Sequence, residues 1–140
     1  MTSLVSVVVT TYNWPEALSL VLNSLADQKD RNFEIIIADD GSAGATTRVI
    51  ENFAATCPVP VKHYWHEDSG FRVAKARNGA IAMAKGDLVV FIDGDCCVMP
   101  DFVNRHRKAA EAGCFVSGKR VFIKERLTNM LLKRKWAFHK

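Results

Sequence analysis

The chain has 140 residues, of which 49% are hydrophobic and 24% are charged, and its formal net charge is +4. This length suffices for one hydrophobic core and is too short for two comfortable domains, so we expect a single globular unit. No apolar run reaches the roughly 18 residues that a membrane-spanning helix needs. The N-terminus enters a strand pattern without the charged start and cleavage site of a secretory signal, which predicts cytoplasmic residence.

The cysteines and the basic residues bear on the kind of partner. The four cysteines show no regular spacing, which predicts reduced thiols rather than a disulfide framework or a zinc knuckle: Cys57, Cys96, Cys97 and Cys114. Residues 119–140 hold eight lysines and arginines against Glu125 alone. Such a segment can meet anionic lipid or nucleic acid. No nucleic-acid-binding motif accompanies the charge, so we expect no nucleic-acid partner.

The first strand and helix are marked by their residue pattern. Residues 4–10 are rich in β-branched side chains and predict a strand. Asn13 is a candidate N-cap and Pro15 suits a first helical turn. Apolar residues then recur at helical spacing, which predicts an amphipathic helix that packs on a sheet: Leu18, Val21, Leu22 and Leu25.

Strands and helices are expected to alternate through the next sixty residues. The apolar runs 33–38, 61–65 and 88–92 predict strands, and the patterns at 45–55 and 74–84 predict helices. The polar stretch 66–73 predicts a loop. Such alternation with short connections indicates an α/β fold with a doubly wound, mostly parallel sheet and helices on both faces. The run 88–92 is apolar throughout, so we expect a central strand that is buried on both faces.

The C-terminal third has weaker signals. Residues 101–112 predict a helix, and the short runs 114–117 and 121–123 predict two brief strands. Residues 127–138 predict a basic amphipathic helix with an apolar side that includes Leu127, Met130, Leu131 and Trp136.

Polar residues follow three of the predicted parallel strands, where ligands of such sheets bind: Thr11-Tyr12-Asn13, Asp39-Asp40 and Asp93-Gly94-Asp95. Two carboxylates beside a core need compensation from a divalent cation, a cationic side chain or a sugar hydroxyl. Neither G-x-G-x-x-G nor a Walker loop is present, so no dinucleotide or P-loop site is indicated. The clusters therefore predict a site that handles phosphate in another way.

A nucleoside diphosphate that carries a further group fits these side chains. Asp95 can supply an oxygen ligand to Mg²⁺ or Mn²⁺ and Asp93 can accept from ribose hydroxyls. Asp39 can accept an N–H from a base on which Tyr12 stacks, and Arg77 can donate to base carbonyls or phosphate.

For single residues, purely structural roles stay open as alternatives. Tyr12 can be a packing residue, Asp40 a cap of the turn at Gly41, and Arg77 a surface ion-pair partner. A zinc site at His63, His66 and Glu67 is disfavoured, because residues three apart on a strand point to opposite faces.

Four motifs taken together, SVVVTTYN, IIIADDGS, HEDSGFRVAKARNGAIAMAKGD and VFIDGDC, resemble the family-2 glycosyltransferases of the GT-A fold over residues 3–103. The resemblance is strongest to bacterial, galactosyltransferase-like members that build polysaccharides. It implies a metal-dependent, inverting transfer of a sugar from a nucleotide sugar, usually a UDP-sugar, to an acceptor hydroxyl. The same resemblance implies that Thr11, Tyr12 and Asp39 line the uracil, that Arg77 approaches it, that Asp93 holds the ribose and that Asp95 binds the metal.

One expected part of such an enzyme is not found in the sequence. The family places its catalytic base well downstream of the D-x-D motif, and the acids after it, Asp101, Glu111 and Glu125, lack the expected context. The pair Glu67-Asp68 precedes that motif. We therefore expect residues 1–118 to be the nucleotide-sugar-binding domain of a longer enzyme that is truncated here, with the catalytic base outside this chain.

Residues 119–140 then have two readings. They begin an acceptor-binding half, or they form an interfacial helix on the inner face of a membrane, near saccharide or lipid-linked acceptors. Truncation would leave Leu131, Leu132, Trp136 and Phe138 without partners, and such exposed apolar surface predicts a homodimer or aggregation of the isolated chain.

Three other functions compete with an active transferase. A fragment that binds UDP without transferring sugar shares every motif. A haloacid-dehalogenase-like phosphatase has a similar D-x-D loop, but after its first strand. A phosphoacceptor receiver domain needs an acidic pair after the first strand, where this chain has Thr10-Thr11-Tyr12-Asn13.

Overall fold

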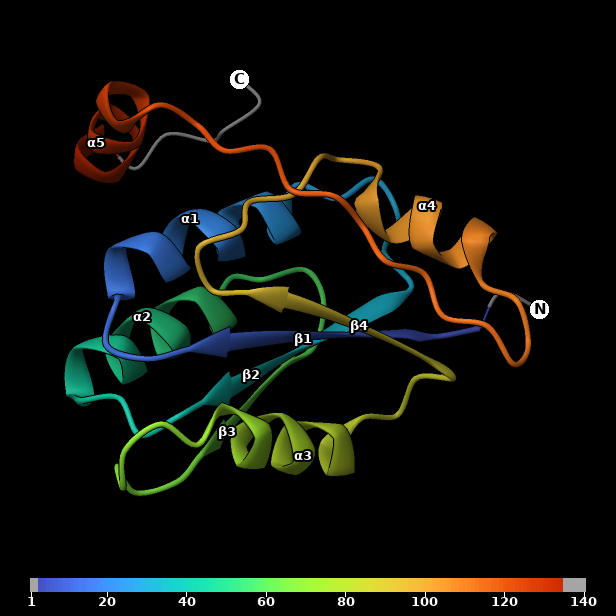
Figure 1. Cartoon of the computed structure of the whole chain (residues 1–140), viewed down its shortest axis with the longest axis horizontal. Coiled ribbons are helices and arrows are strands. Elements are labelled where there is room, and N and C mark those ends of the chain that lie inside the picture. The colour runs from blue at the N-terminus through green and yellow to red at the C-terminus, as the bar shows by residue number, and fades with distance from the viewer. Residues whose placement is uncertain (1–2, 135–140) are drawn as a thin grey trace.

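A computed structural model describes residues 3–134, in which strands and helices alternate around one four-stranded parallel sheet (Figure 1). The strands lie in the order β3-β2-β1-β4, which confirms the predicted α/β class. Their bounds are β1 Val5–Thr11, β2 Phe33–Asp39, β3 Val61–Trp65 and β4 Leu88–Asp93. The helices are α1 Pro15–Ala26, α2 Gly44–Ala54, α3 Val73–Met83, α4 Phe102–Ala109 and α5 Glu125–Arg134.

The two faces of the sheet bury different helices. Val7 and Val9 of β1 join a large core with side chains of α1, α2 and α4. Val8 points to the opposite face, where it packs with Ala76 and Ala80 of α3. Because successive side chains of a strand alternate between faces, β1 and β2 carry apolar side chains on both faces and are buried along their whole length. They form the rigid centre from which the loops at the carboxyl edge project.

The start of α1 differs from the prediction. Asn13 does not cap the helix. The N-cap residue of α1 is Trp14, and its side chain makes no capping hydrogen bond. Asn13 has a positive φ of 46° and accepts a hydrogen bond from the amide of Ala43, at 2.8 Å. The Ser42 hydroxyl in turn accepts from the amide of Asn13 at 2.9 Å. Asn13 therefore ties the end of β1 to the loop after β2, while Pro15 begins the helix as predicted.

The expectation that residues 88–92 form a central strand buried on both faces is wrong. β4 pairs with β1 and forms the edge of the sheet within residues 3–134. Only Val90 is buried, and Phe91 is 47% exposed. The reason is the position of α3, which packs against β1, β2 and β3 and so leaves the β4 side of that face uncovered.

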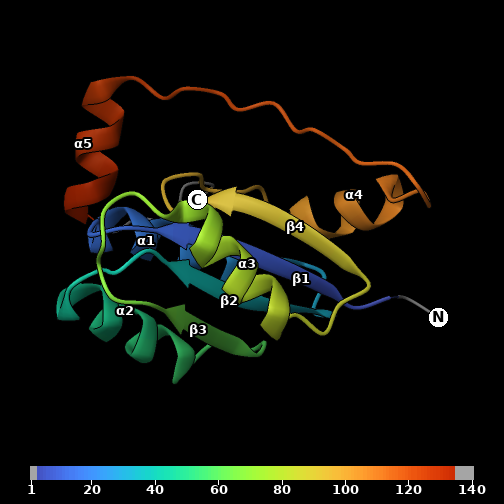
Figure 2. The same ribbon diagram turned by 60° about the horizontal axis from the view of Figure 1, so that its bottom comes forward.

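The C-terminal third is less regular than predicted. The helix expected over 101–112 ends at Ala109, and no strand forms at 114–117 or 121–123. Residues 110–124 are instead an exposed, irregular connection that arches over the β4 side of the sheet from α4 to α5 (Figure 2). No neighbouring strand in the described part of the chain pairs with them, and short strands need such a partner.

The last helix, α5, begins two residues earlier than predicted and packs against α1. Leu131 was expected to lack a partner, but it is only 6% exposed because α5 docks on the body of the protein. Trp136 and Phe138 lie outside the described residues. The domain boundary at residue 118 stays a prediction. No helix within residues 3–134 has the length and hydropathy that crossing a bilayer requires.

Candidate functional site

A pocket of about 370 Å³ opens at the carboxyl ends of the strands. Because β1, β2 and β4 are parallel, the residues that follow them lie at one edge of the sheet. Trp14, which precedes α1, and the residues around the start of α3 complete the walls. The lining residues are Thr10, Thr11, Tyr12, Trp14, Asp40, Gly70, Phe71, Val73, Asp93, Gly94 and Asp95.

The D-x-D turn at the end of β4 is held tightly against β1. The amide of Gly94 donates to the carbonyl oxygen of Thr10 at 2.7 Å. A Cβ atom at position 94 would lie 2.6 Å from that same oxygen, so only glycine fits this close approach. The turn therefore places Asp93 and Asp95 on the pocket wall.

Asp93 is compensated by cationic side chains. Its Oδ1 accepts from the Thr10 hydroxyl and from Nη2 of Arg77, both at 3.1 Å. Its Oδ2 lies 3.3 Å from Nη1 of Arg120. Arg77 thus forms an ion pair, as the alternative interpretation suggested, and its partner is the D-x-D residue Asp93. Arg77 positions Asp93 and is not among the residues that line the pocket.

The D-x-D residues fit a divalent cation. One carboxylate oxygen from each of Asp93 and Asp95 and the Cys96 sulfur lie within 4.8 Å of one another. Burial, and then the charge of Asp95, raise the pKa of the Cys96 thiol, so that at neutral pH the carboxylates supply the anionic donors. Carboxylate oxygens are the ligands that Mg²⁺ and Mn²⁺ prefer.

The structure buries Asp39, which was expected to line the base, and places Asp40 on the pocket wall. Asp39 is fully buried, and its oxygens accept from the amide of Ser42 at 2.8 Å and from Nε2 of His63 at 2.9 Å. Burial alone raises the pKa of Asp39, but the hydrogen bonds from His63 and Ser42 outweigh it and hold that pKa below its ordinary value. Asp39 therefore caps the turn, the role that the alternative interpretation gave to Asp40, and it is not among the residues that line the pocket. Asp40 lines the pocket.

Asp40 also anchors the loop that forms one wall. Its Oδ2 accepts from the amide of Arg72 at 2.9 Å, and its Oδ1 lies 3.0 Å from Nε2 of His66. The same loop packs against Gly41, where a Cβ atom would lie 2.6 Å from the Cα of Asp68. Gly41 has a φ of +92°, which favours glycine in any case. The loop over residues 66–72 is thereby fixed beside the end of β2.

Three aromatic side chains surround the mouth of the pocket. Tyr12 and Trp14 are 52% and 45% exposed and Phe71 is 90% exposed. The Tyr12 hydroxyl donates to Oδ2 of Asp68 at 2.9 Å, and this bond raises the pKa of Tyr12. Tyr12 is therefore not a core residue, and its ring is free to contact a ligand. Thr11 lines the same pocket, at 7% exposure.

His63 and His66 bind separate acids and do not gather around a metal. His63 pairs with Asp39 and His66 lies against Asp40. The disfavoured zinc site with Glu67 is not among the metal-binding groups found in residues 3–134.

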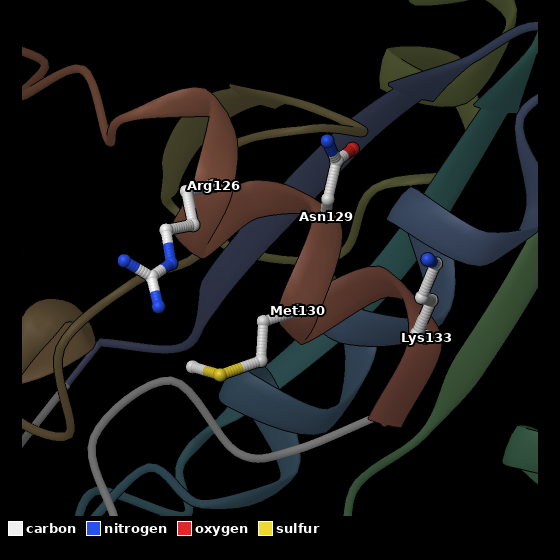
Figure 3. Close-up of a pocket in the computed structure, with 4 residues that line it drawn as sticks. All are labelled: Arg126, Asn129, Met130 and Lys133. Carbon is white, nitrogen blue, oxygen red and sulfur yellow. The ribbon is translucent and has the colours of Figure 1, made fainter.

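A second hollow, of about 340 Å³, lies on α5 (Figure 3). Its four lining residues all come from one face of that helix: Arg126, Asn129, Met130 and Lys133. No second element in the described chain contributes to its wall, and it is far in sequence from the polar strand ends. We therefore assign the functional site to the pocket at the sheet edge.

Sequence reasoning missed several residues of the site. Trp14, Gly70 and Phe71 line the pocket, and Arg120 reaches Asp93 from a segment 27 residues downstream. Phe71 lies within the motif EDSGFRVAKARN, so the motif could have indicated that Phe71 belongs to the site. Nothing in the sequence around Arg120 indicated its contact.

The fold and the site define a class of protein, a parallel α/β fold with a carboxylate pair and aromatic walls at the carboxyl edge of the sheet. The family model described as glycosyl transferase family 2 matches residues 6–139. The chain therefore belongs to glycosyl transferase family 2.

Relatives and solved structures agree with this family. Validoxylamine A glucosyltransferase of Streptomyces hygroscopicus subsp. jinggangensis is 37% identical over 112 residues, which are 79% of this chain and 26% of that protein. The crystal structure of S. aureus TarS 1-349 in complex with UDP-GlcNAc is 30% identical, with a TM-score of 0.61, over 72% of this chain and 29% of that one.

A third similarity bears on the fold alone. The mannosyltransferase PcManGT of Pyrobaculum calidifontis, in complex with GDP-Man and Mn²⁺, has a TM-score of 0.70 at 24% identity, over 80% of this chain and 34% of that one. The architecture is thus that of GT-A glycosyltransferases. The chain spans about a quarter of the length of the curated relatives it matches first.

Proposed function

We propose that this chain is the nucleotide-sugar-binding part of a glycosyltransferase that transfers a sugar from a UDP-sugar to an acceptor hydroxyl with inversion. The observation that carries the proposal is the pocket itself. It places an exposed tyrosine, a buried aspartate and the D-x-D carboxylates at one sheet edge, in a chain that is 30% identical to a protein crystallised with UDP-GlcNAc.

The donor would lie along the pocket from the end of β1 to the end of β4. Tyr12 stacks on the uracil and Thr11 borders it. Asp40 accepts the N–H of the base, because Asp40 lines the pocket whereas Asp39 is inaccessible to solvent and does not line it. Each carboxylate oxygen has a second lone pair, so the contacts of Asp40 with Arg72 and His66 leave acceptor capacity. Asp93, oriented by Arg77 and Thr10, accepts from the ribose hydroxyls, and Asp95 binds Mn²⁺ or Mg²⁺.

The chemistry needs charge compensation and a base. A divalent cation, when bound, neutralises the negative charge that grows on the departing nucleoside diphosphate. In an inverting transfer the acceptor hydroxyl attacks the sugar carbon from the face opposite to the departing nucleoside diphosphate. A carboxylate base deprotonates that hydroxyl during the attack. We assign this base to no residue of the described chain: each carboxylate on the pocket wall already has a role toward the donor.

The acceptor and the cellular setting follow from the relatives and from the charge of the chain. We propose a saccharide or lipid-linked acceptor in the synthesis of cell-surface polysaccharide or lipopolysaccharide. TarS is named as a poly(ribitol-phosphate) β-N-acetylglucosaminyltransferase, which supports a surface polymer. The basic C-terminal segment supports a cytoplasmic enzyme that lies peripherally on the inner face of the membrane.

The first experiment is calorimetric titration of UDP with and without Mn²⁺, beside ADP. We expect metal-dependent binding of UDP that Asp95→Asn abolishes and that ADP does not match. Asp87→Asn is the matched control, because Asp87 is an exposed aspartate just before β4, at the opposite end of the strand. Equal binding of UDP by Asp95→Asn would contradict the proposal.

A fragment that binds UDP without transferring sugar is the second candidate. The observation in its favour is that no described residue is assigned as the base. Incubation with a UDP-sugar, Mn²⁺ and a saccharide acceptor separates the two. Release of UDP that depends on the acceptor supports the enzyme, and binding without release supports the fragment.

A further inference from the structure

The connection between α4 and α5 reaches the D-x-D motif through one side chain. Residues 110–124 are all exposed and form neither helix nor strand (Figure 2). Within this stretch Arg120 is tethered to the body, because its Nη1 lies 3.3 Å from Oδ2 of Asp93. The segment thus brings a cation to the pocket wall.

Arg120 adds a second positive charge beside Asp93, which one guanidinium already neutralises. Oδ1 of Asp93 already accepts from Arg77 at 3.1 Å and from the Thr10 hydroxyl. Asp93, the nearby Asp95 and the two arginines form a cluster of two carboxylates and two guanidiniums at the D-x-D turn, which balance in charge. A divalent cation adds two positive charges, and the diphosphate of a nucleotide sugar carries two negative charges. With the cation bound, these four side chains and the cation carry two positive charges, which the diphosphate neutralises; without Arg120 they carry only one.

The guanidinium of Arg120 is also free to contact a ligand. Its side chain is 64% exposed, whereas Arg107, which ties α4 to Asp30, is 12% exposed. A guanidinium has five N–H donors in a planar fork that matches phosphate oxygens. Its contact with Asp93 leaves other donors for a ligand at the mouth of the pocket.

We propose that Arg120 is a diphosphate-binding residue, whose guanidinium contacts the phosphates of the donor nucleotide beside Asp93 and Asp95. The inference rests on the proposed function, because it requires a nucleoside diphosphate in this pocket. It assigns a task to a segment that otherwise only connects two helices. The alternative is that Arg120 competes with the divalent cation for Asp93.

The test measures the affinity for UDP with Mn²⁺ by calorimetry and the affinity for uridine by NMR titration, since uridine lacks phosphates. Arg120→Ala is expected to lose about tenfold or more in UDP affinity, as a charged hydrogen bond contributes that much, with uridine affinity unchanged. Arg120→Lys should recover part of the loss. Lys119→Ala is the matched control, because Lys119 is exposed on the same segment.

Each other result overturns the inference. Equal UDP affinity of Arg120→Ala and the wild type shows that Arg120 does not bind the phosphates. Tighter Mn²⁺ binding by Arg120→Ala without a loss of UDP affinity identifies it as a competitor of the cation. An equal loss for uridine shows a defect of the whole pocket. If the folded wild type binds no UDP, the proposed function fails and this inference with it.

Discussion

Replacing Asp39 with asparagine should lower the stability of the protein while leaving nucleotide binding intact. Asp39 is inaccessible to solvent and accepts two hydrogen bonds, from the Ser42 amide at 2.8 Å and from His63 at 2.9 Å. Asparagine keeps one acceptor for Ser42 but turns an amide N–H₂ group toward His63. Hydrogen bonds to charged groups contribute ~1.5–3 kcal/mol, so we expect the free energy of unfolding to fall by about 2–3 kcal/mol.

Urea unfolding followed by circular dichroism gives this free energy, and UDP titration at 10 °C gives the affinity of the folded variant. We expect Asp39→Asn to unfold at a lower urea concentration and to bind UDP within twofold of the wild type. The matched variant is Asp40→Asn, one residue away. It should weaken UDP binding about tenfold, because Asp40 lines the pocket and would lose a charged acceptor for the base.

The opposite pattern would refute this reasoning. If Asp39→Asn lost UDP affinity at unchanged stability, Asp39 would contact the nucleotide directly, and the buried geometry at the end of β2 would not describe the binding-competent state. If Asp40→Asn bound UDP like the wild type, the base would be recognised elsewhere.

Three further predictions concern other parts of the chain. Burial raises the pKa of Glu34, but hydrogen bonds from Lys62, the Lys85 amide and Ser6 hold it below its ordinary value. The ionised form of Glu34 therefore stabilises the fold at every pH above its ordinary pKa. This contribution is lost as the pH falls through the lowered pKa of the folded state. The urea midpoint should therefore fall more steeply in acid for the wild type than for Glu34→Gln. Gly94→Ala should weaken Mn²⁺ and UDP binding in calorimetry about tenfold while the circular dichroism spectrum persists, because its Cβ would overlap the Thr10 carbonyl. Leu131→Ala should lower the free energy of unfolding by ~2 kcal/mol if α5 is docked on α1, and an unchanged urea midpoint would contradict that docking.

The helices and strands of the N-terminal hundred residues could be predicted because local pattern and burial agree there. The strands at β1, β2 and β3 and the helices α1 to α3 start and end within one or two residues of the predicted positions. The prediction of secondary structure and burial failed where these depend on a neighbouring element. Residues 114–117 and 121–123 have strand-like composition but no strand beside them, and β4 is apolar throughout yet lies at the edge of the sheet.

The candidate site was predictable to the level of its strand ends. The positions of Tyr12, Asp93 and Asp95 follow from parallel strands whose carboxyl ends share an edge. The roles of Asp39 and Asp40 were not predictable, because adjacent residues at the end of a strand point to opposite sides. Which of the two faces the pocket depends on His63 and Arg72, which come from other elements.

The sequence by itself determined the fold class and the three polar clusters, because apolar periodicity and short connections leave few ways to build a parallel sheet. Only the tertiary structure decided which carboxylate is buried, which loop forms the wall of the pocket, and that Arg120 reaches Asp93 from 27 residues away. Contacts of this kind join residues distant in the chain. Their distances are set by the packing of whole elements, which no local pattern records.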